Sequence, residues 1–210
     1  MRDFADHINA NAEKWDRRAT SYDQRRFDYF RFMQRKLLSF IGLQKPTTLL
    51  DLGCGTGWAV RTAAEMLEGD GRFVGIDISP EMIKRAKAKA LGMNAVEFHR
   101  ASADKLPFED NSFDIVICTN SFHHYPDPVK ALAEARRVLR KQGHIYVLDL
   151  TRDTFWVRWL NRRVTKKEKE HVKFYSTAEY REMFRTASFT YIQSKSLMYP
   201  MKIHIAQNQV

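Results

Sequence analysis

Short apolar runs alternate with amphipathic stretches through the middle of the chain. Runs such as TTLLDL and FDIVICTN are apolar at nearly every position, as expected of strands buried on both faces of a parallel sheet. The stretches between the runs repeat their apolar residues at helical spacing. The pattern predicts strands over 47–52, 72–78, 95–100, 113–120 and 144–150, and helices over 58–67, 81–91 and 128–140.

Residues with a preference for helix ends support these helices. Ser79 and Asp127 can each cap a helix, and each is followed by a proline at the first helical position, where a missing N–H costs nothing. Gly143 is expected to end the last of the three helices, just before the strand over 144–150.

The two ends of the chain depart from this alternation. Residues 6–41 have a helical pattern that breaks near Thr20 and Ser21. Toward the other end, a serine or a threonine, Ser176 or Thr177, is placed to cap a helix over 178–187. Two further strands, 191–200 and 202–210, are joined by so short a connection that they must pair antiparallel.

Strands that alternate with helices predict a parallel sheet with right-handed crossovers. We therefore expect a single α/β domain over 1–210, with a doubly wound, mostly parallel, seven-stranded Rossmann-like sheet, an antiparallel last strand and N-terminal helices. Its expected parts are a helical N-terminal cap (1–45), a ligand-binding core (46–150), a basic and aromatic insert (151–176) and a closing helix with strands (177–210).

Composition narrows the class of protein. The chain has 210 residues, of which 44% are apolar, enough for one buried core. It has no apolar run long enough to cross a membrane and no apolar signal-peptide segment at its start, so the cytoplasm is the expected location. Cys54 and Cys118 lack the spacing of metal ligands, and we expect two buried, reduced thiols and no metal site.

The net charge of +10 is concentrated in one segment. Residues 151–175 hold eight Lys and Arg against three acids, which is half of the excess, together with the aromatic residues Phe155, Trp156 and Trp159. Such a segment can be a solvated amphipathic helix packed on the core, a lid over an apolar or anionic substrate, a dimer contact or a membrane-surface patch. The oligomeric state is left open by the sequence.

The stretch LLDLGCGTGWAV places three glycines, Gly53, Gly55 and Gly57, directly after the first predicted strand. In a doubly wound sheet, ligands bind in such loops at the carboxyl ends of the strands. A dinucleotide fingerprint would need glycine at position 58, where the chain has Trp58, and the phosphate-binding loop of nucleotide hydrolases also fails on spacing. The loop therefore favours a ligand other than a phosphate.

Two acidic residues near this loop also favour a ligand without a phosphate at the loop. Asp77 ends the next predicted strand, where a carboxylate can accept hydrogen bonds from both hydroxyls of a ribose, as in NAD or S-adenosylmethionine. Asp51 precedes the loop and would repel a pyrophosphate, although it could orient a ligand that carries an ammonium group. The alternative is that the glycines only form a tight turn and the acids only cap helices or loops.

Together, L-D-L-G-C-G-T-G and the downstream G-I-D-I-S resemble the class I S-adenosylmethionine-dependent methyltransferases of the methyltransferase type 11 group, and more narrowly the ubiquinone/menaquinone-type C-methyltransferases. The resemblance extends over about 47–150, and weakly over 15–23 and the final helix and strands. It implies S-adenosylmethionine as the cofactor and S-adenosylhomocysteine as its product. These motifs are specific for the cofactor and say little about the substrate.

The resemblance also implies roles for single residues. The backbone at the three glycines and the side chain of Asn120 would contact the methionine part of the cofactor, and Asp77 would bind the ribose. Ile78 and Met82 would lie against adenine, and Tyr22, in W-x-x-x-A-x-x-Y-D, would cover the cofactor.

One stretch departs from the family pattern. Related sequences read G-D-A-E-x-L-P-F where this chain has ASADKLPF, so Ser102 replaces the Asp that meets the adenine amino group. A hydroxyl lacks the charge that strengthens such a bond. Adenine affinity is then reduced, or Asp104 substitutes, or the backbone N–H of Ala103 suffices.

Methyl transfer from a sulfonium is an in-line displacement that depends mainly on proximity, and its nucleophile can still need a general base. His123 and His124, in NSFHHYPDP, are the candidates for that base, and they can equally be structural residues of the loop. Phe122 and Tyr125 either wall the pocket or pack in the core.

We expect a methyltransferase that acts on a small-molecule acceptor of unknown identity. The alternatives are an enzyme with the same cofactor that acts on RNA or protein, and a protein that binds S-adenosylmethionine without transferring its methyl group. The basic segment supports the RNA alternative, but the sequence has no RNA-binding module or Asn-Pro-Pro-Tyr-like motif. Trp58 argues against a dehydrogenase.

Overall fold

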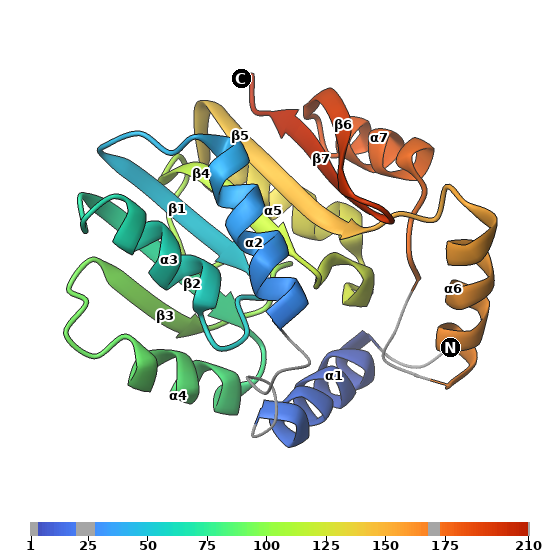
Figure 1. Ribbon diagram of the computed structural model, residues 1–210, viewed down its shortest axis with the longest axis horizontal. Helices are drawn as coiled ribbons and strands as arrows, with labels where there is room; N and C mark the ends of the chain where they lie inside the picture. Colours follow the sequence, from blue (N-terminus) through green and yellow to red (C-terminus); the bar gives the residue numbers. More distant parts are fainter. Residues whose placement is uncertain (1–3, 20–27, 168–172, 210) are drawn as a thin grey trace.

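Five parallel strands form the centre of the molecule (Figure 1). The computed structural model describes residues 4–19, 28–167 and 173–209. Its sheet has the order β3-β2-β1-β4-β5-β7-β6, in which β1 to β5 are parallel. These five strands are β1 (Thr47–Leu52), β2 (Gly71–Asp77), β3 (Val96–Arg100), β4 (Phe113–Thr119) and β5 (Leu139–Leu150).

The last two strands extend the sheet beyond β5. β7 (Met201–Gln207) lies between β5 and β6 (Thr190–Met198) and runs antiparallel to both. The expected mostly parallel, seven-stranded sheet with an antiparallel last strand is therefore confirmed for the described residues. The finer division of the chain into four parts stays a prediction.

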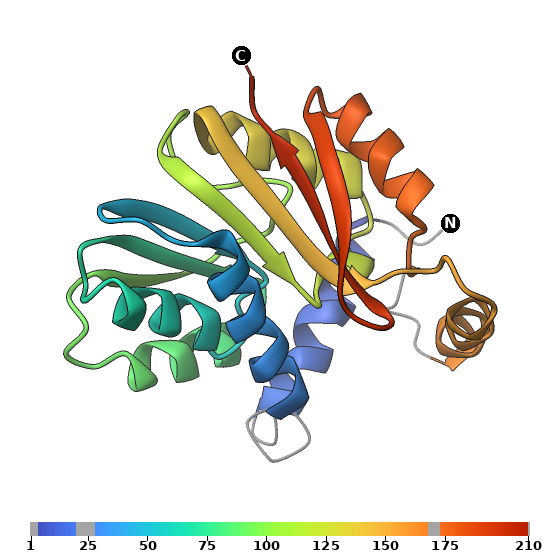
Figure 2. The ribbon, with the colours of Figure 1, turned by 45° about the horizontal axis from the view of Figure 1, so that its top comes forward.

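Helices cover both faces of the sheet (Figures 1 and 2). On one face, α2 (Asp28–Ile41), α3 (Trp58–Met66) and α4 (Pro80–Lys89) contribute apolar residues to the hydrophobic core that includes Leu49 of β1. On the other face, α5 (Pro128–Val138) and α7 (Thr177–Thr186) contribute to the hydrophobic core that includes Leu50. Adjacent residues of one strand thus enter different cores, which is why the strand reads as a continuous apolar run.

Two helices lie at the carboxyl-terminal edge of the sheet instead of on its faces (Figure 1). α1 (Phe4–Ala19) packs beside α4, and α6 (Phe155–Lys167) follows the end of β5. The structure describes α1 up to Ala19 and α2 from Asp28, so the break predicted near Thr20 and Ser21 lies outside the described residues. No helix in the described part of the chain is long and apolar enough to cross a membrane.

The predicted helix starts are confirmed. The side chain of Ser79 accepts a hydrogen bond from the N–H of Met82, and Asp127 does the same for Lys130. At α7, Ser176 is the capping residue, and it forms a reciprocal pair of side-chain to backbone hydrogen bonds with Glu179.

The predicted role of Gly143 is wrong. α5 already ends at Val138, and Gly143 lies inside β5. A Cβ atom at this position would lie 2.8 Å from the carbonyl oxygen of Arg140 and 3.0 Å from that of Asp114. The glycine is thus required by close backbone contacts where β5 starts to pair with β4. No local pattern in the sequence predicts this extension of the strand.

Candidate functional site

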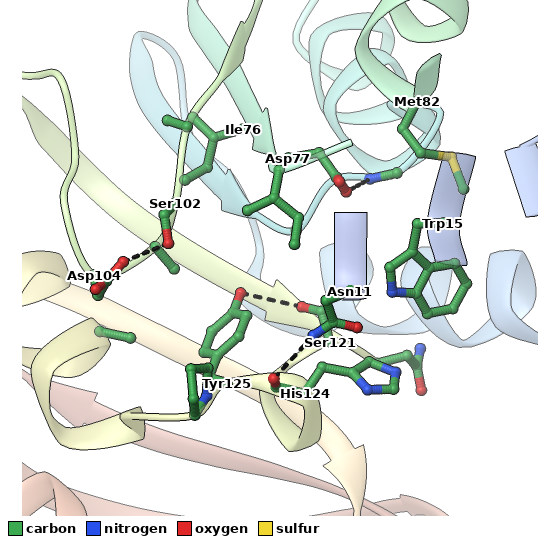
Figure 3. A pocket seen from close by; sticks show the side chains of 18 of the residues that line it. Asn11, Trp15, Ile76, Asp77, Met82, Ser102, Asp104, Ser121, His124 and Tyr125 are labelled. Atoms are coloured by element: carbon green, nitrogen blue, oxygen red, sulfur yellow. Dashed lines mark hydrogen bonds between the residues drawn. The ribbon is translucent and has the colours of Figure 1, made fainter. Parts of the chain in front are cut away.

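A pocket opens at the carboxyl ends of β1, β2 and β4, where the strand order reverses direction (Figure 3). It encloses about 810 Å³, including its open mouth. Its walls come from the glycine loop, the end of β2, the loops after β3 and β4, and two residues of α1, Asn11 and Trp15. This is where a parallel doubly wound sheet is expected to bind a ligand.

The glycine loop is held in a conformation that favours glycine. Gly53, Gly55 and Gly57 have φ angles of 73°, 54° and 76°. A Cβ atom on Gly53 would lie 2.6 Å from Oγ of Ser121, and one on Gly57 would collide with the ring of Phe98. Gly53 and Gly55 line the pocket, whereas Gly57 is the capping residue of α3 and does not.

Asp77 lines the pocket and fixes the glycine loop. Its carboxylate accepts one hydrogen bond from the N–H of Gly55 and one from the N–H of Ser79, both 2.9 Å long. Burial raises the pKa of Asp77 to about 6, although these backbone N–H groups lower it in part. A carboxylate offers about four acceptor positions, so Asp77 can accept ligand hydroxyls as well.

Two buried polar groups beside the loop have no hydrogen-bond partner among the described residues. One is the carboxyl group of Asp51, in which neither oxygen has a partner, and the other is the amide nitrogen Nδ2 of Asn120. Burial raises the pKa of Asp51 well above its usual range, and the nearby Asp77 raises it further. An unsatisfied carboxyl group and an unsatisfied N–H donor are the kinds of group that bind an ammonium and a carboxylate, the two charged groups at the amino-acid end of a metabolite.

The loop after β3 brings the three candidate adenine contacts together. Ser102, Ala103 and Asp104 all line the pocket. The hydroxyl of Ser102 donates a hydrogen bond to Asp104 (Figure 3). The other carboxylate oxygen of Asp104 lies 3.3 Å from Nζ of Lys130. Ser102, which stands where related sequences have an aspartate, is therefore hydrogen-bonded directly to Asp104.

The adjacent histidines differ in their surroundings. His124 lines the pocket, its ring packs edge-to-face against Trp15, and its carbonyl accepts a hydrogen bond from Asn11. His123 is not among the lining residues. Its Nδ1 lies 2.8 and 2.9 Å from the two oxygens of Asp149, a buried carboxylate near the end of β5.

The structure thus gathers most of the predicted site. Of the predicted residues, those that line the pocket are Gly53, Gly55, Asp77, Ile78, Met82, Ser102, Ala103, Asn120 and His124. Asp51, Gly57 and His123 lie outside the pocket walls, and Tyr22 lies outside the described residues.

Residues of α1 were missed as pocket walls. Asn11 and Trp15 are four positions apart, so they lie on the same face of the helix, and both line the pocket. α1 is fixed there by Asp16, which accepts hydrogen bonds from the hydroxyl of Ser79 and the N–H of Glu81. The four-residue spacing was visible in the sequence, but the contact of α1 with α4 was not.

The central part of the chain matches a family model described as a methyltransferase domain, over residues 50–147. An uncharacterised 37.1 kDa protein in transposon TN4556 of Streptomyces fradiae is 33% identical over 145 residues, which cover 69% of this chain and 42% of that protein. A demethylmenaquinone methyltransferase of Staphylococcus aureus is 33% identical over 129 residues, 61% of this chain and 53% of that enzyme. The chain spans about half the length of these curated relatives.

Solved structures share the fold over most of the chain. The methyltransferase in a complex with the Haloferax volcanii Trm112 methyltransferase activator has a TM-score of 0.82 at 21% identity, covering 93% of this chain and 98% of that one. A SAM-dependent methyltransferase from Aquifex aeolicus has a TM-score of 0.74 at 23% identity, with coverage of 91% and 97%. The YcgJ protein from Bacillus subtilis has a TM-score of 0.68 at 28% identity, with coverage of 77% and 70%.

Proposed function

We propose that the chain is a class I S-adenosylmethionine-dependent methyltransferase that transfers the methyl group of S-adenosylmethionine to a small-molecule acceptor. The observation that carries the proposal is the pair of unsatisfied polar groups beside the glycine loop, the carboxylate of Asp51 and the amide Nδ2 of Asn120. When bound, the cofactor supplies an activated methyl sulfonium, so the protein must chiefly align the acceptor.

The residues present fit this cofactor. Asp51 would hold the ammonium group, which would also reduce the cost of burying its carboxylate, and Asn120 would donate to the carboxylate. Asp77 would accept the ribose hydroxyls, with Ile78 and Met82 beside the adenine.

The adenine edge of the site is built differently from that of the related sequences. We place Ser102 and Asp104 there as one hydrogen-bonded unit, in which Asp104 keeps the charge that Ser102 lacks. Ala103 offers its backbone N–H in the same loop. Tyr22 remains a predicted cover of the cofactor.

We further propose that His123 accepts the proton that the acceptor loses. Because Asp149 binds Nδ1, it favours the tautomer with a proton on that atom and leaves Nε2 as the basic nitrogen. The His123 ring packs 4.8 Å from the ring of Phe174 and 4.1 Å from that of His124. It thus stands between a pocket wall and the segment that precedes α7, which is where we place the acceptor.

The first acceptor to test follows from one relative. The Staphylococcus aureus protein is a demethylmenaquinone methyltransferase, and its similarity supports a small, apolar acceptor such as demethylmenaquinone. An RNA acceptor is the alternative, and it predicts methyl transfer that falls steeply as salt rises. Labelled methyl transfer to demethylmenaquinone, a metabolite extract and bulk RNA distinguishes these acceptors.

Calorimetry with full and truncated ligands tests the cofactor. S-adenosylmethionine and S-adenosylhomocysteine should bind, and Asp51→Asn and Asn120→Ala should each weaken them about tenfold or more. Methylthioadenosine has the adenine and ribose but no amino-acid part, so neither substitution should change its affinity. Asp70→Asn, at an exposed acid between α3 and β2, is the matched control. Binding of NAD alone would overturn the proposal.

A further inference from the structure

α6 presents an apolar surface that the described part of the protein does not cover. On its inner side Val157 is buried and the side-chain oxygen of Asn161 accepts a hydrogen bond from the N–H of Phe174. On its outer side are four exposed side chains, Phe155, Trp156, Trp159 and Leu160, which we call the α6 patch. Phe155 is 77% exposed and Trp156 is 66% exposed.

This concentration is unusual within the described residues. Four of their ten large exposed hydrophobic side chains belong to the α6 patch. A fifth, Tyr199, lies next to it, because its hydroxyl bonds the Thr154 hydroxyl just before α6 begins. Single exposed apolar residues are ordinary, whereas a group of them on one helix indicates a binding surface.

The same helix is strongly basic. Arg158, Arg162, Arg163 and Lys166 are exposed, and α6 has no acidic residue. In the described structure none of these four cations forms an ion pair, and the Arg163 guanidinium lies 4.2 Å from the centre of the Trp159 ring. Their charge is therefore available to an anionic surface.

Apolar and basic residues occupy overlapping sectors of the helix. At about 100° per residue, the α6 patch spans an arc of about 140°. Arg158, Arg162 and Lys166 form a basic sector of about 80° that overlaps the Phe155 edge of the patch, and Arg163 lies within the patch. Val157 lies on the opposite side. A helix that lies in the headgroup region of an anionic bilayer typically combines Trp, Phe and Leu with neighbouring Arg and Lys.

The position of α6 suits this geometry. Figures 1 and 2 show α6 at the rim of the molecule, outside the end of β5 and beyond the hairpin of β6 and β7. It leaves the sheet from the edge at which the pocket opens. A flat surface can therefore reach the outer side of α6 along its length.

From these observations we propose that α6 docks the protein on an anionic lipid surface, with the α6 patch among the lipid headgroups and the basic sector on their negative charges. This inference concerns attachment only and does not depend on the reaction proposed above. A bilayer is favoured over RNA because Phe155 and Leu160 add aliphatic and aromatic surface without a hydrogen-bonding group.

The test is binding of the whole protein to vesicles of phosphatidylcholine alone and to vesicles that also contain phosphatidylglycerol. The wild type should bind the anionic vesicles, less tightly as salt rises, with a blue shift of tryptophan fluorescence. Phe155→Ser with Trp156→Ser should weaken binding about tenfold or more. Arg158→Gln and Arg162→Gln should each weaken it about fivefold.

Matched controls come from the opposite edge of the sheet. Leu91→Ser removes another highly exposed apolar residue and Lys141→Gln another exposed cation, and neither should change vesicle binding. All variants should keep the wild-type melting temperature, because the replaced side chains are exposed.

Three results would overturn the proposal. They are no vesicle binding by the wild type, vesicle binding that the patch and charge variants leave unchanged, and RNA binding or dimer formation that depends on α6 without any vesicle binding. Because methyl transfer is not the readout, failure of this proposal leaves the proposed reaction standing, and the reverse also holds.

Discussion

Replacing Asp77 with asparagine removes a charge and nearly keeps the shape of the side chain. Asp77 accepts hydrogen bonds from the N–H groups of Gly55 and Ser79, each at 2.9 Å. The amide of asparagine has one acceptor oxygen, so one of these donors loses its partner. A ligand hydroxyl also loses a charged acceptor, and the affinity for S-adenosylmethionine should fall about tenfold to a hundredfold.

The same substitution changes how folding stability depends on pH. Burial raises the pKa of Asp77 from 3.8 to about 6 in the folded protein. Because the folded-state pKa lies above the unfolded one, Asp77 favours folding below about pH 4, and this contribution is lost as pH rises to about 6. The shift corresponds to at most about 3 kcal/mol, and to less here because the side chain borders an open pocket.

Urea unfolding of the ligand-free wild type and Asp77→Asn, from about pH 4 to about pH 7, measures this effect. As pH rises, the free energy of unfolding of the wild type should fall relative to that of the variant, while calorimetry at neutral pH shows the weaker ligand binding. Methylthioadenosine should lose affinity as well, since it keeps the ribose. A stability difference that is constant over this pH range, with unchanged ligand affinity, would refute the role assigned to Asp77.

Three further predictions follow from the contacts around the site and at α7. His123→Ala and Asp149→Asn should slow methyl transfer about a hundredfold or more and leave cofactor affinity unchanged, and a rate equal to wild type would remove the proposed base. Gly53→Ala should lower both stability and cofactor affinity because its Cβ meets a neighbouring side chain, whereas Gly42→Ala has the same left-handed backbone in open space and should lose only about 1 kcal/mol. Glu179→Gln should reduce the free energy of unfolding by about 1–2 kcal/mol at pH 7. The reason is that the hydrogen bonds of Glu179 at the start of α7 and its cationic neighbours lower its pKa to about 2. The difference between wild type and variant should vanish as pH falls from about 4.5 to about 2.

The sheet could be predicted because its signals are local. Leu49 and Leu50 belong to one short apolar run, and each enters a different core. The antiparallel pairing of β6 and β7 followed from their short connection, but the insertion of β7 between β5 and β6 did not, because strand order depends on long-range packing. Gly143 was misread for the same reason, since its close contacts are to a neighbouring strand.

The pocket was predictable where a motif and a strand end coincide. The glycine loop, Asp77 and Asn120 each follow a strand directly, and parallel strands end at one edge of the sheet. Trp15 reaches the pocket only because α1 packs on α4, and Asp149 meets His123 only because β5 lies beside β4. Neither contact has a signal within a short stretch of sequence.

Substitutions can therefore affect the two sides of the site separately. The side that we assign to the cofactor consists of loops that follow β1 to β4, where backbone hydrogen bonds such as those to Asp77 fix the residues. The side that we assign to the acceptor depends on His123, Asp149 and Phe174, and the Phe174 backbone is bonded to Asn161 of α6. Substitutions in α6 and the segment after it can therefore reshape acceptor binding without disturbing the glycine loop. This is a physical reason why the motifs of the chain identify the cofactor and leave the acceptor to experiment.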